Sequence, residues 1–339
     1  MTVLFSCVCI AIVALYVVTV VATARLSRSY PSSEHFIDLN GRRLHCAERG
    51  TPSRDRPSLI FLHGASSNHR EFIIALGKER LADLSKHWHL IFLDRPGQGG
   101  SDRAAGDQSP RVQADLAIAA AKELGAPSVI AIGHSWGASV VAQMAVHGGD
   151  FVQGAVFCAP ATHPWPGERF RGVDWFYAVA GMPIIGWLFT RLIVLPVAWN
   201  QIGPGAEKVF APDPTKPDYA DALGARLVLR PKAFQANAQD VYQLRPFVTA
   251  QAPTYVRITC PVQIITGNKD KVVWPEIHSD GLARDISGAH KTVIEGGGHM
   301  PHQTHPDLVL KAIDAVNAAR LAGSAQMPSS ISAEPTNVT

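Results

Sequence analysis

Short apolar runs alternate with longer stretches of helical periodicity along most of the chain. The runs lie at residues 58–62, 90–93, 129–132, 154–160, 262–266 and 292–294. Stretches with helical periodicity occupy residues 110–124, 138–147 and 306–321, and a further one ends near residue 84. Strands that alternate with helices at this spacing are typical of a parallel sheet with helices on both faces. The pattern therefore predicts an α/β fold with a mostly parallel sheet.

A hairpin precedes this alternation. Residues 35–39 and 42–48 flank the dipeptide Asn40-Gly41, which favours a tight turn between antiparallel strands. The sheet is therefore expected to begin with an antiparallel pair.

The alternation stops between residues 161 and 258. From residue 175 to 199 the only charged side chain of this insertion is that of Arg191. A second membrane span is one interpretation, but four Gly or Pro residues interrupt the stretch and the arginine lies near its centre. We predict instead a helical cap over the sheet, at about residues 162–257. Its aromatic side chains either form the core of the cap or line a substrate pocket.

The N-terminal segment is the most apolar part of the chain. Residues 3–24 carry no charge, and this length can cross the hydrocarbon core of a bilayer as a helix. Ala22-Thr23-Ala24 also fits a signal-peptide cleavage site, but no Lys or Arg precedes the apolar stretch. We predict an uncleaved single-pass anchor at residues 1–25; a cleaved signal and a secreted or periplasmic protein are the alternative. Arg25 and Arg28 favour a globular domain on the cytoplasmic side.

The rest of the chain divides into a linker at residues 27–33, one globular domain at residues 34–321 and a tail at 322–339. The tail is rich in Ser, Pro and Ala without periodicity, which predicts disorder. A net charge of +3 without a basic tract argues against a nucleic-acid partner. The five cysteines form no C-x-x-C motif, so neither a metal site nor a disulfide framework is expected.

Three predicted strand ends carry residues that together could perform nucleophilic catalysis. Ser135 follows the run 129–132 within Gly-His-Ser-Trp-Gly, Asp270 follows the run 262–266, and His299 follows the run 292–294. Ligands bind beyond the carboxyl ends of parallel strands, so these loops should meet. An imidazole with a pKa near ~6.5 can take the proton of a serine hydroxyl, and a carboxylate can orient that imidazole. A catalytic triad is therefore predicted.

The aspartate and the histidine of the predicted triad each have rivals. Asp94 precedes the serine in the chain and stands in a Pro/Gly-rich turn, so we assign it a structural role. His302 and His305 lie close to His299, but three glycines precede only His299 and permit the close backbone approach that the base needs.

Five motifs in this order resemble the α/β-hydrolase family across residues 34–321. They are Phe61-Leu62-His63-Gly64, residues 94–101 (Asp-Arg-Pro-Gly-Gln-Gly-Gly-Ser), residues 133–137, residues 266–270 and Gly297-Gly298-His299. The resemblance implies an oxyanion hole made by the amides of Trp136 and Ala65, with no cofactor and no metal. It also implies acyl transfer, because the family's haloalkane dehalogenases and epoxide hydrolases carry aspartate in place of the serine.

We therefore predict a membrane-tethered serine hydrolase that acts on a small-molecule carboxylic ester, more apolar than polar. A thioesterase, a carbon–carbon bond hydrolase and a perhydrolase would use the same three residues. A non-catalytic ligand-binding protein with this fold is the alternative from another class. The natural substrate and the oligomeric state stay open.

Overall fold

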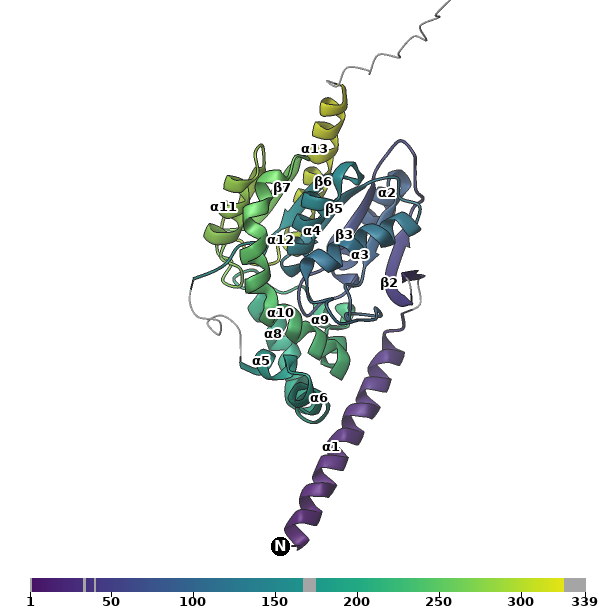
Figure 1. The fold of residues 1–339 in the computed structure, drawn as a ribbon, viewed down its shortest axis with the longest axis vertical. Coiled ribbons are helices and arrows are strands. Elements are labelled where there is room, and N and C mark those ends of the chain that lie inside the picture. The colour runs from purple at the N-terminus through teal and green to yellow at the C-terminus, as the bar shows by residue number, and fades with distance from the viewer. Residues whose placement is uncertain (1, 33–34, 40, 167–174, 326–339) are drawn as a thin grey trace, which may run out of the picture.

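The computed structural model describes residues 2–32, 35–39, 41–166 and 175–325, and its centre is one eight-stranded sheet (Figure 1). The strand order is β1-β2-β4-β3-β5-β6-β7-β8; β1, β2 and β4 pair antiparallel and all other neighbours pair parallel. This confirms the predicted α/β fold. The strands are β1 (His35–Leu39), β2 (Arg42–Arg49), β3 (Ser58–Leu62), β4 (Leu90–Leu93), β5 (Val129–His134), β6 (Val152–Cys158), β7 (Val262–Gly267) and β8 (His290–Ile294).

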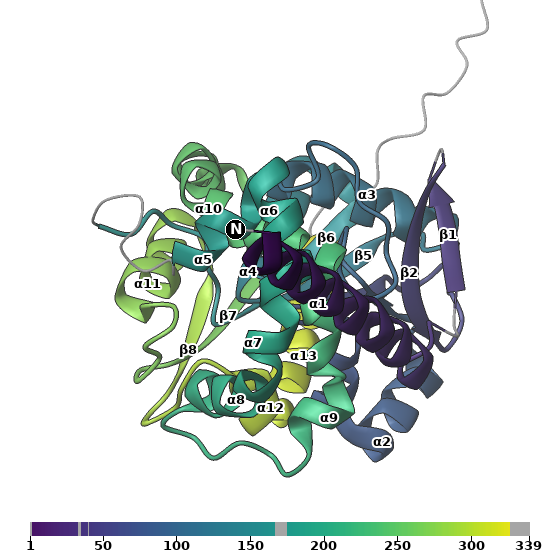
Figure 2. The ribbon, with the colours of Figure 1, turned by 90° about the horizontal axis from the view of Figure 1, so that it is seen from below.

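Helices cover both faces of the sheet (Figures 1 and 2). They are α2 (Arg70–His87), α3 (Pro110–Glu123), α4 (Trp136–His147), α11 (Pro275–Asp285), α12 (Pro301–Thr304) and α13 (Pro306–Ala325). Alternate residues of β3 enter two cores: Ile60 and Leu62 pack with α3 and α4, whereas Leu59 and Phe61 pack with α2 and α13. A strand buried on both faces needs a continuous apolar run, which explains why these strands were visible in the sequence.

The insertion between β6 and β7 is helical. It contains α5 (Trp175–Gly181), α6 (Ile184–Phe189), a π-helical turn (Thr190–Val194), α7 (Leu195–Ala198), α8 (Ile202–Phe210), α9 (Tyr219–Leu223) and α10 (Pro231–Gln251). Of the four tryptophans of this insertion, Trp199 packs on the cap core and Trp165 on the main core, whereas Trp175 and Trp187 are exposed. They are therefore not all cap core.

Helix α1 (Thr2–Ser29) projects from the cap side of the domain (Figure 1). Within it only Thr19 and Leu26 are buried. By length and composition α1 is a candidate membrane span, and the cap stretch Ile184–Phe210 passes the same criterion.

Both ends of the chain differ from prediction by a few residues. The expected linker at residues 27–33 is helical through Ser29, because Leu26 packs on the domain and the first breaker is Pro31. Helix α13 reaches Ala325, past the predicted end near residue 321. The rest of the predicted tail, residues 326–339, lies outside the described residues.

Candidate active site

Ser135 occupies a strained turn between β5 and α4. Its backbone has φ +51° and ψ −115°, a conformation that a side-chain-bearing residue adopts only when its surroundings impose it. A Cβ on Gly133 would lie 2.7 Å from Val141 Cγ2, and one on Gly137 would lie 2.3 Å from a backbone oxygen of β3. Both small residues are therefore required by close packing, and the strand, turn and helix have the backbone geometry that a nucleophile elbow needs.

Asp270 and His299 form a direct pair. The loops after β7 and β8 lie so close that a Cβ on Gly267 would meet a backbone oxygen of the His299 loop at 2.2 Å. His299 Nδ1 lies 2.7 Å from Asp270 Oδ2, while Asp270 Oδ1 accepts hydrogen bonds from the Val272 and Val273 amides at 2.8 and 2.9 Å. Burial alone would raise the pKa of Asp270, but His299 and the two amides hold it below its usual value.

His299 is also held beside the elbow through its backbone. His134, the residue before Ser135, lies with Nε2 3.1 Å from the His299 carbonyl oxygen and Nδ1 2.9 Å from Glu71 Oε1. Both ring nitrogens of His134 therefore lie at hydrogen-bond distance from an oxygen. Burial alone would raise the pKa of Glu71, but His134 and then His302 hold it well below its usual value. A buried His134–Glu71 contact therefore joins α2 to the base and to the elbow.

Arg95 positions the loop that should carry the first oxyanion amide, residues 63–66. Its guanidinium donates to the carbonyl oxygens of His63 at 2.9 Å and Gly64 at 3.0 Å. A trans peptide directs its N–H away from its C=O, so fixing the Gly64 oxygen also fixes the Ala65 amide. Gly64 lies against the elbow, since a Cβ there would be 3.3 Å from Ser135 Cβ.

The second predicted oxyanion residue begins a helix. Trp136 is the first residue of α4, where backbone N–H groups have no intrahelical acceptor. Its side chain is 1% exposed, and its indole N–H donates to the Asp240 carbonyl oxygen at 3.0 Å. The elbow is therefore anchored to the cap helix α10.

Sequence reasoning missed the cluster of charges around this loop. Arg95 pairs with Asp240 at 2.8 Å, Arg103 pairs with the other oxygen of that carboxylate at 2.9 Å, and the Arg95 guanidinium lies 4.2 Å from the Trp136 ring centroid. Asn237, one turn before Asp240, accepts from the Ser66 amide at 2.6 Å. Arg95 stands in one of the family motifs and could have been found there, whereas α10 offers no motif.

The rivals of the triad have other partners. Asp94 is fully buried and accepts from the backbone amides of His69 at 2.7 Å and Gly100 at 2.8 Å, as expected for a structural residue. His302 faces Glu71 at 3.4 Å, and burial, followed by His134, lowers the pKa of His302 to about 4.

Two buried clusters have the composition of metal sites. In each, the candidate ligand atoms lie within 4.8 Å of one another; the clusters are His45, His69, Asp94 and Glu71, His134, His302. In both clusters the carboxylate already accepts hydrogen bonds from imidazole and backbone amides. Hydrogen bonding therefore accounts for both carboxylates, and the expectation of no metal stays a prediction.

Residues 59–312 match the model of the family described as "Alpha/beta hydrolase family", which spans the motifs and all three triad positions. The chain belongs to the alpha/beta hydrolase family. Among curated proteins it is similar to Protein NDRG1-B of Xenopus laevis, with 27% identity over 176 residues that cover 49% of this chain and 44% of that protein. Protein NDRG4-A of the same organism is 33% identical over 128 residues, covering 36% and 33%. The match thus spans less than half the length of these relatives.

Solved structures with the same fold cover nearly the whole chain. A membrane phospholipase A described as a bacterial virulence factor aligns with TM-score 0.64 and 21% identity, covering 94% of this chain and 97% of that chain. The epoxide hydrolase CorEH aligns with TM-score 0.67 and 20% identity, covering 85% and 99%. A thermophilic esterase from Thermogutta terrifontis aligns with TM-score 0.63 and 19% identity, covering 84% and 97%. At these identities the likeness concerns the fold.

Proposed function

We propose that this protein is a membrane-anchored serine hydrolase that cleaves a carboxylic ester of an apolar, lipid-like substrate. Two observations carry the proposal. Ser135 occupies a strained elbow, and the His299 ring, whose centroid lies 4.9 Å from that of the preceding residue His134, is paired through Nδ1 with the buried Asp270 carboxylate at 2.7 Å. With Nδ1 donating to the carboxylate, Nε2 is left as the acceptor for the serine proton.

The reaction follows in two halves. Ser135 Oγ attacks the acyl carbon as His299 Nε2 takes the hydroxyl proton, and the Trp136 and Ala65 amides bind the oxyanion, each for about 3 kcal/mol. Collapse of the tetrahedral intermediate breaks the ester C–O bond, and His299 gives the proton to the departing alcohol. Water then attacks the acyl-serine as His299 takes a proton from it. The acyl C–Oγ bond breaks, His299 returns the proton to Ser135 Oγ, and the acid leaves.

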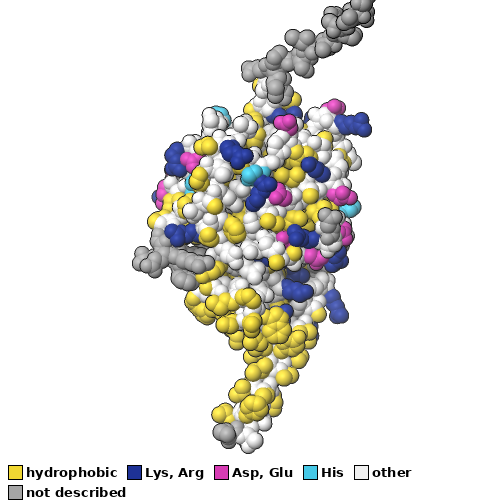
Figure 3. Space-filling view, viewed as in Figure 1, with side chains coloured by type: hydrophobic (Ala, Val, Ile, Leu, Met, Phe, Trp, Pro, Cys, Tyr) yellow, Lys and Arg dark blue, Asp and Glu magenta, His cyan; other side chains and the backbone are white. Residues whose placement is uncertain are grey.

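The preference for lipid rests on the cap and on α1. Eight large apolar side chains between residues 175 and 197 of the cap are exposed: Trp175, Met182, Ile184, Ile185, Trp187, Leu188, Ile193 and Val197. Figure 3 shows apolar side chains gathered at the end of the domain from which α1 leaves. Exposed apolar patches of this kind mark interaction with membranes or other apolar partners. A structural neighbour described as a membrane phospholipase A and another as a putative lipase support the same substrate class.

The proposal also includes the membrane anchor and the side of the membrane on which the catalytic domain lies. Helix α1 is long and apolar enough to span a bilayer, and Arg25 and Arg28 at its end favour a cytoplasmic catalytic domain. Cleavage after Ala24 and release of the domain is the competing outcome, and N-terminal analysis of the protein from its native membrane distinguishes the two.

A panel of nitrophenyl esters and thioesters with acyl chains from acetyl to palmitoyl tests the reaction. We expect kcat/KM to rise with chain length for esters, and Ser135→Ala to lose at least about 10³-fold. Ser139→Ala, in the same helix, is the matched control and should retain activity. A steady fall from short to long chains would contradict the lipid preference, and faster thioester cleavage would favour the thioesterase. A folded wild type with no turnover of any substrate would favour a non-catalytic binding protein.

A further inference from the structure

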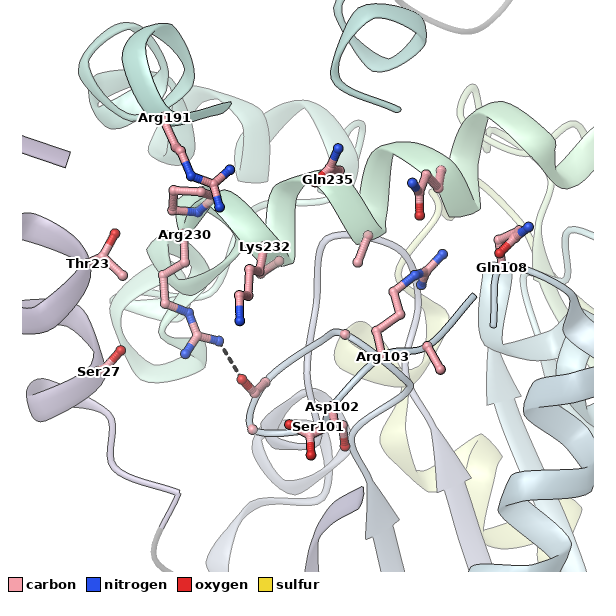
Figure 4. Close-up of a pocket in the computed structure, with 18 of the residues that line it drawn as sticks. Thr23, Ser27, Ser101, Asp102, Arg103, Gln108, Arg191, Arg230, Lys232 and Gln235 are labelled. Atoms are coloured by element: carbon pink, nitrogen blue, oxygen red, sulfur yellow. Dashed lines mark hydrogen bonds between the residues drawn. The ribbon is translucent and has the colours of Figure 1, made fainter. Parts of the chain in front are cut away.

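A cleft of about 1320 Å³ lies between α1, the cap and the loop after β4, apart from the triad. Ser135, Asp270 and His299 are not among its lining residues. The side chains of Arg191, Arg230 and Lys232 extend into it from the cap, facing Thr23 and Ser27 of α1 (Figure 4). A molecule bound here would lie between the membrane helix and the domain.

The cleft carries an excess of positive charge. Three of its charged lining residues are paired: Arg42 with Asp107 at 3.0 Å, Arg103 with Asp240 at 2.9 Å, and Asp102 with Arg43 at 3.3 Å. Within the described part of the chain, Arg191, Arg230 and Lys232 have no carboxylate within ion-pair distance. Three cations thus lack an anionic partner in one cleft.

The helix that carries two of these cations adds to the positive electrostatic potential of the cleft. Arg230 is the N-cap of the 21-residue helix α10 and Lys232 lies in its first turn, which holds no acidic residue and no side-chain cap. An uncapped helix N-terminus presents free backbone N–H groups and a partial positive charge, the combination that binds phosphate.

The opposite wall offers hydroxyl groups that have no partner. Thr19 is 1% exposed, and the buried hydroxyl oxygens of Thr19 and Thr23 make no hydrogen bond among the described residues. Both threonines line the cleft. A buried hydroxyl without a partner costs about 1–3 kcal/mol. Both oxygens are closed to solvent, so a ligand acceptor would relieve this cost once these side chains turn towards the cleft.

The depth of the cleft identifies the ligand. A bilayer core of about 30 Å takes up about 20 helical residues, so a span that begins near residue 3 leaves the core between Thr19 and Ser27. The phosphate groups of the lipids lie at that level. We propose that this cleft binds the phosphate-bearing headgroup of an anionic phospholipid, which is retained there intact and is not the substrate. This inference rests on the proposed membrane anchor.

The test uses the full chain in a neutral detergent, with spin-labelled phosphatidylglycerol, spin-labelled phosphatidylcholine and inorganic phosphate as probes. The immobilised fraction of the spin label gives the apparent dissociation constant. We expect phosphatidylglycerol to bind at least about tenfold more tightly than phosphatidylcholine, since each membrane-surface cation contributes about fivefold. Lys232→Gln should lose about fivefold and the double variant with Arg230→Gln about 25-fold. Lys232 has no ion pair or hydrogen bond among the described residues, so its replacement should leave folding intact.

Two further variants sharpen the result. Thr19→Val removes the buried hydroxyl and should weaken phosphatidylglycerol binding about threefold or more. Lys311→Gln, on the exposed face of α13 and not among the residues that line the cleft, removes the same charge and should change nothing.

Several outcomes would overturn the site. Equal affinity for phosphatidylglycerol and phosphatidylcholine would contradict recognition of an anionic lipid. A loss of phosphatidylglycerol affinity in Lys311→Gln as large as that in Lys232→Gln would show general charge attraction and no specific site. Displacement of the lipid by equimolar inorganic phosphate would show a soluble-anion site instead. A purified chain that begins after Ala24 lacks Thr19 and Thr23 and would contradict both anchor and site. Ester hydrolysis, measured on the same preparation, separates failure of this site from failure of the catalytic proposal.

Discussion

Replacing Asp270 by asparagine should abolish nearly all turnover while leaving the fold intact. Asp270 Oδ1 accepts from the amides of Val272 and Val273, so the asparagine oxygen must stay there and its NH₂ group must face His299. That NH₂ group would then lie 2.7 Å from Nδ1, where two donors cannot meet. The proton of the ring must move to Nε2, which can no longer accept the serine proton.

The expected loss of kcat is about 10⁴-fold, the cost of a wrong tautomer in a Ser-His-Asp triad. Steady-state hydrolysis of a nitrophenyl ester measures it. The matched control is Glu295→Gln, which removes a charge from a neighbouring exposed loop and should retain kcat within about twofold. A loss below about tenfold in Asp270→Asn, with an unchanged unfolding midpoint, would refute the assignment of Asp270 as the orienting carboxylate.

Three further predictions concern the surroundings of the triad. Gly137→Ala should lower the free energy of unfolding by about 2 kcal/mol or more in urea denaturation, because its Cβ would meet a β3 backbone oxygen at 2.3 Å. Gly203→Ala, in open space on α8, is the control and should not destabilise the protein. Equal urea midpoints for Gly137→Ala and the wild type would contradict the close packing at Gly137. Arg95→Lys keeps the charge but loses the fork that holds two carbonyls, so kcat should fall about 10- to 100-fold with little change in KM; a change in KM alone would contradict a positioning role. Burial lowers the pKa of His63 and His302 to about 4, so below pH ~6.5 the unfolded chain binds more protons than the folded chain. The free energy of unfolding should therefore fall as the pH is lowered from ~6.5 to ~4. A urea midpoint that stays constant across that range would contradict this prediction.

The strands and the placement of the three candidate residues at strand ends were predictable because their signals are local. β3 is buried on both faces and therefore reads as one apolar run, and the elbow needs small residues at fixed positions around Ser135. Asp270 and His299 follow strands that end at the same edge of the sheet, so parallel topology alone brings their loops together.

The network that supports the triad was not predictable because its partners are far apart in sequence. Arg95 and Asp240 are separated by 145 positions, and His134 and Glu71 by 63. Asp240 lies on a cap helix whose packing against the sheet no periodicity reveals. The extent of α1 was missed for a related reason: Leu26 continues the helix through a tertiary contact with the domain.

Labelling with a fluorophosphonate probe, followed by peptide mass spectrometry, tests the central claim most directly. The wild type should carry one adduct, on the oxygen of Ser135, because that hydroxyl in the elbow is the proposed nucleophile that the His299–Asp270 pair activates. Ser139→Ala should be labelled like the wild type and Ser135→Ala should not. A folded wild type without the adduct, or an adduct that persists in Ser135→Ala, would contradict the assignment of Ser135 as the nucleophile.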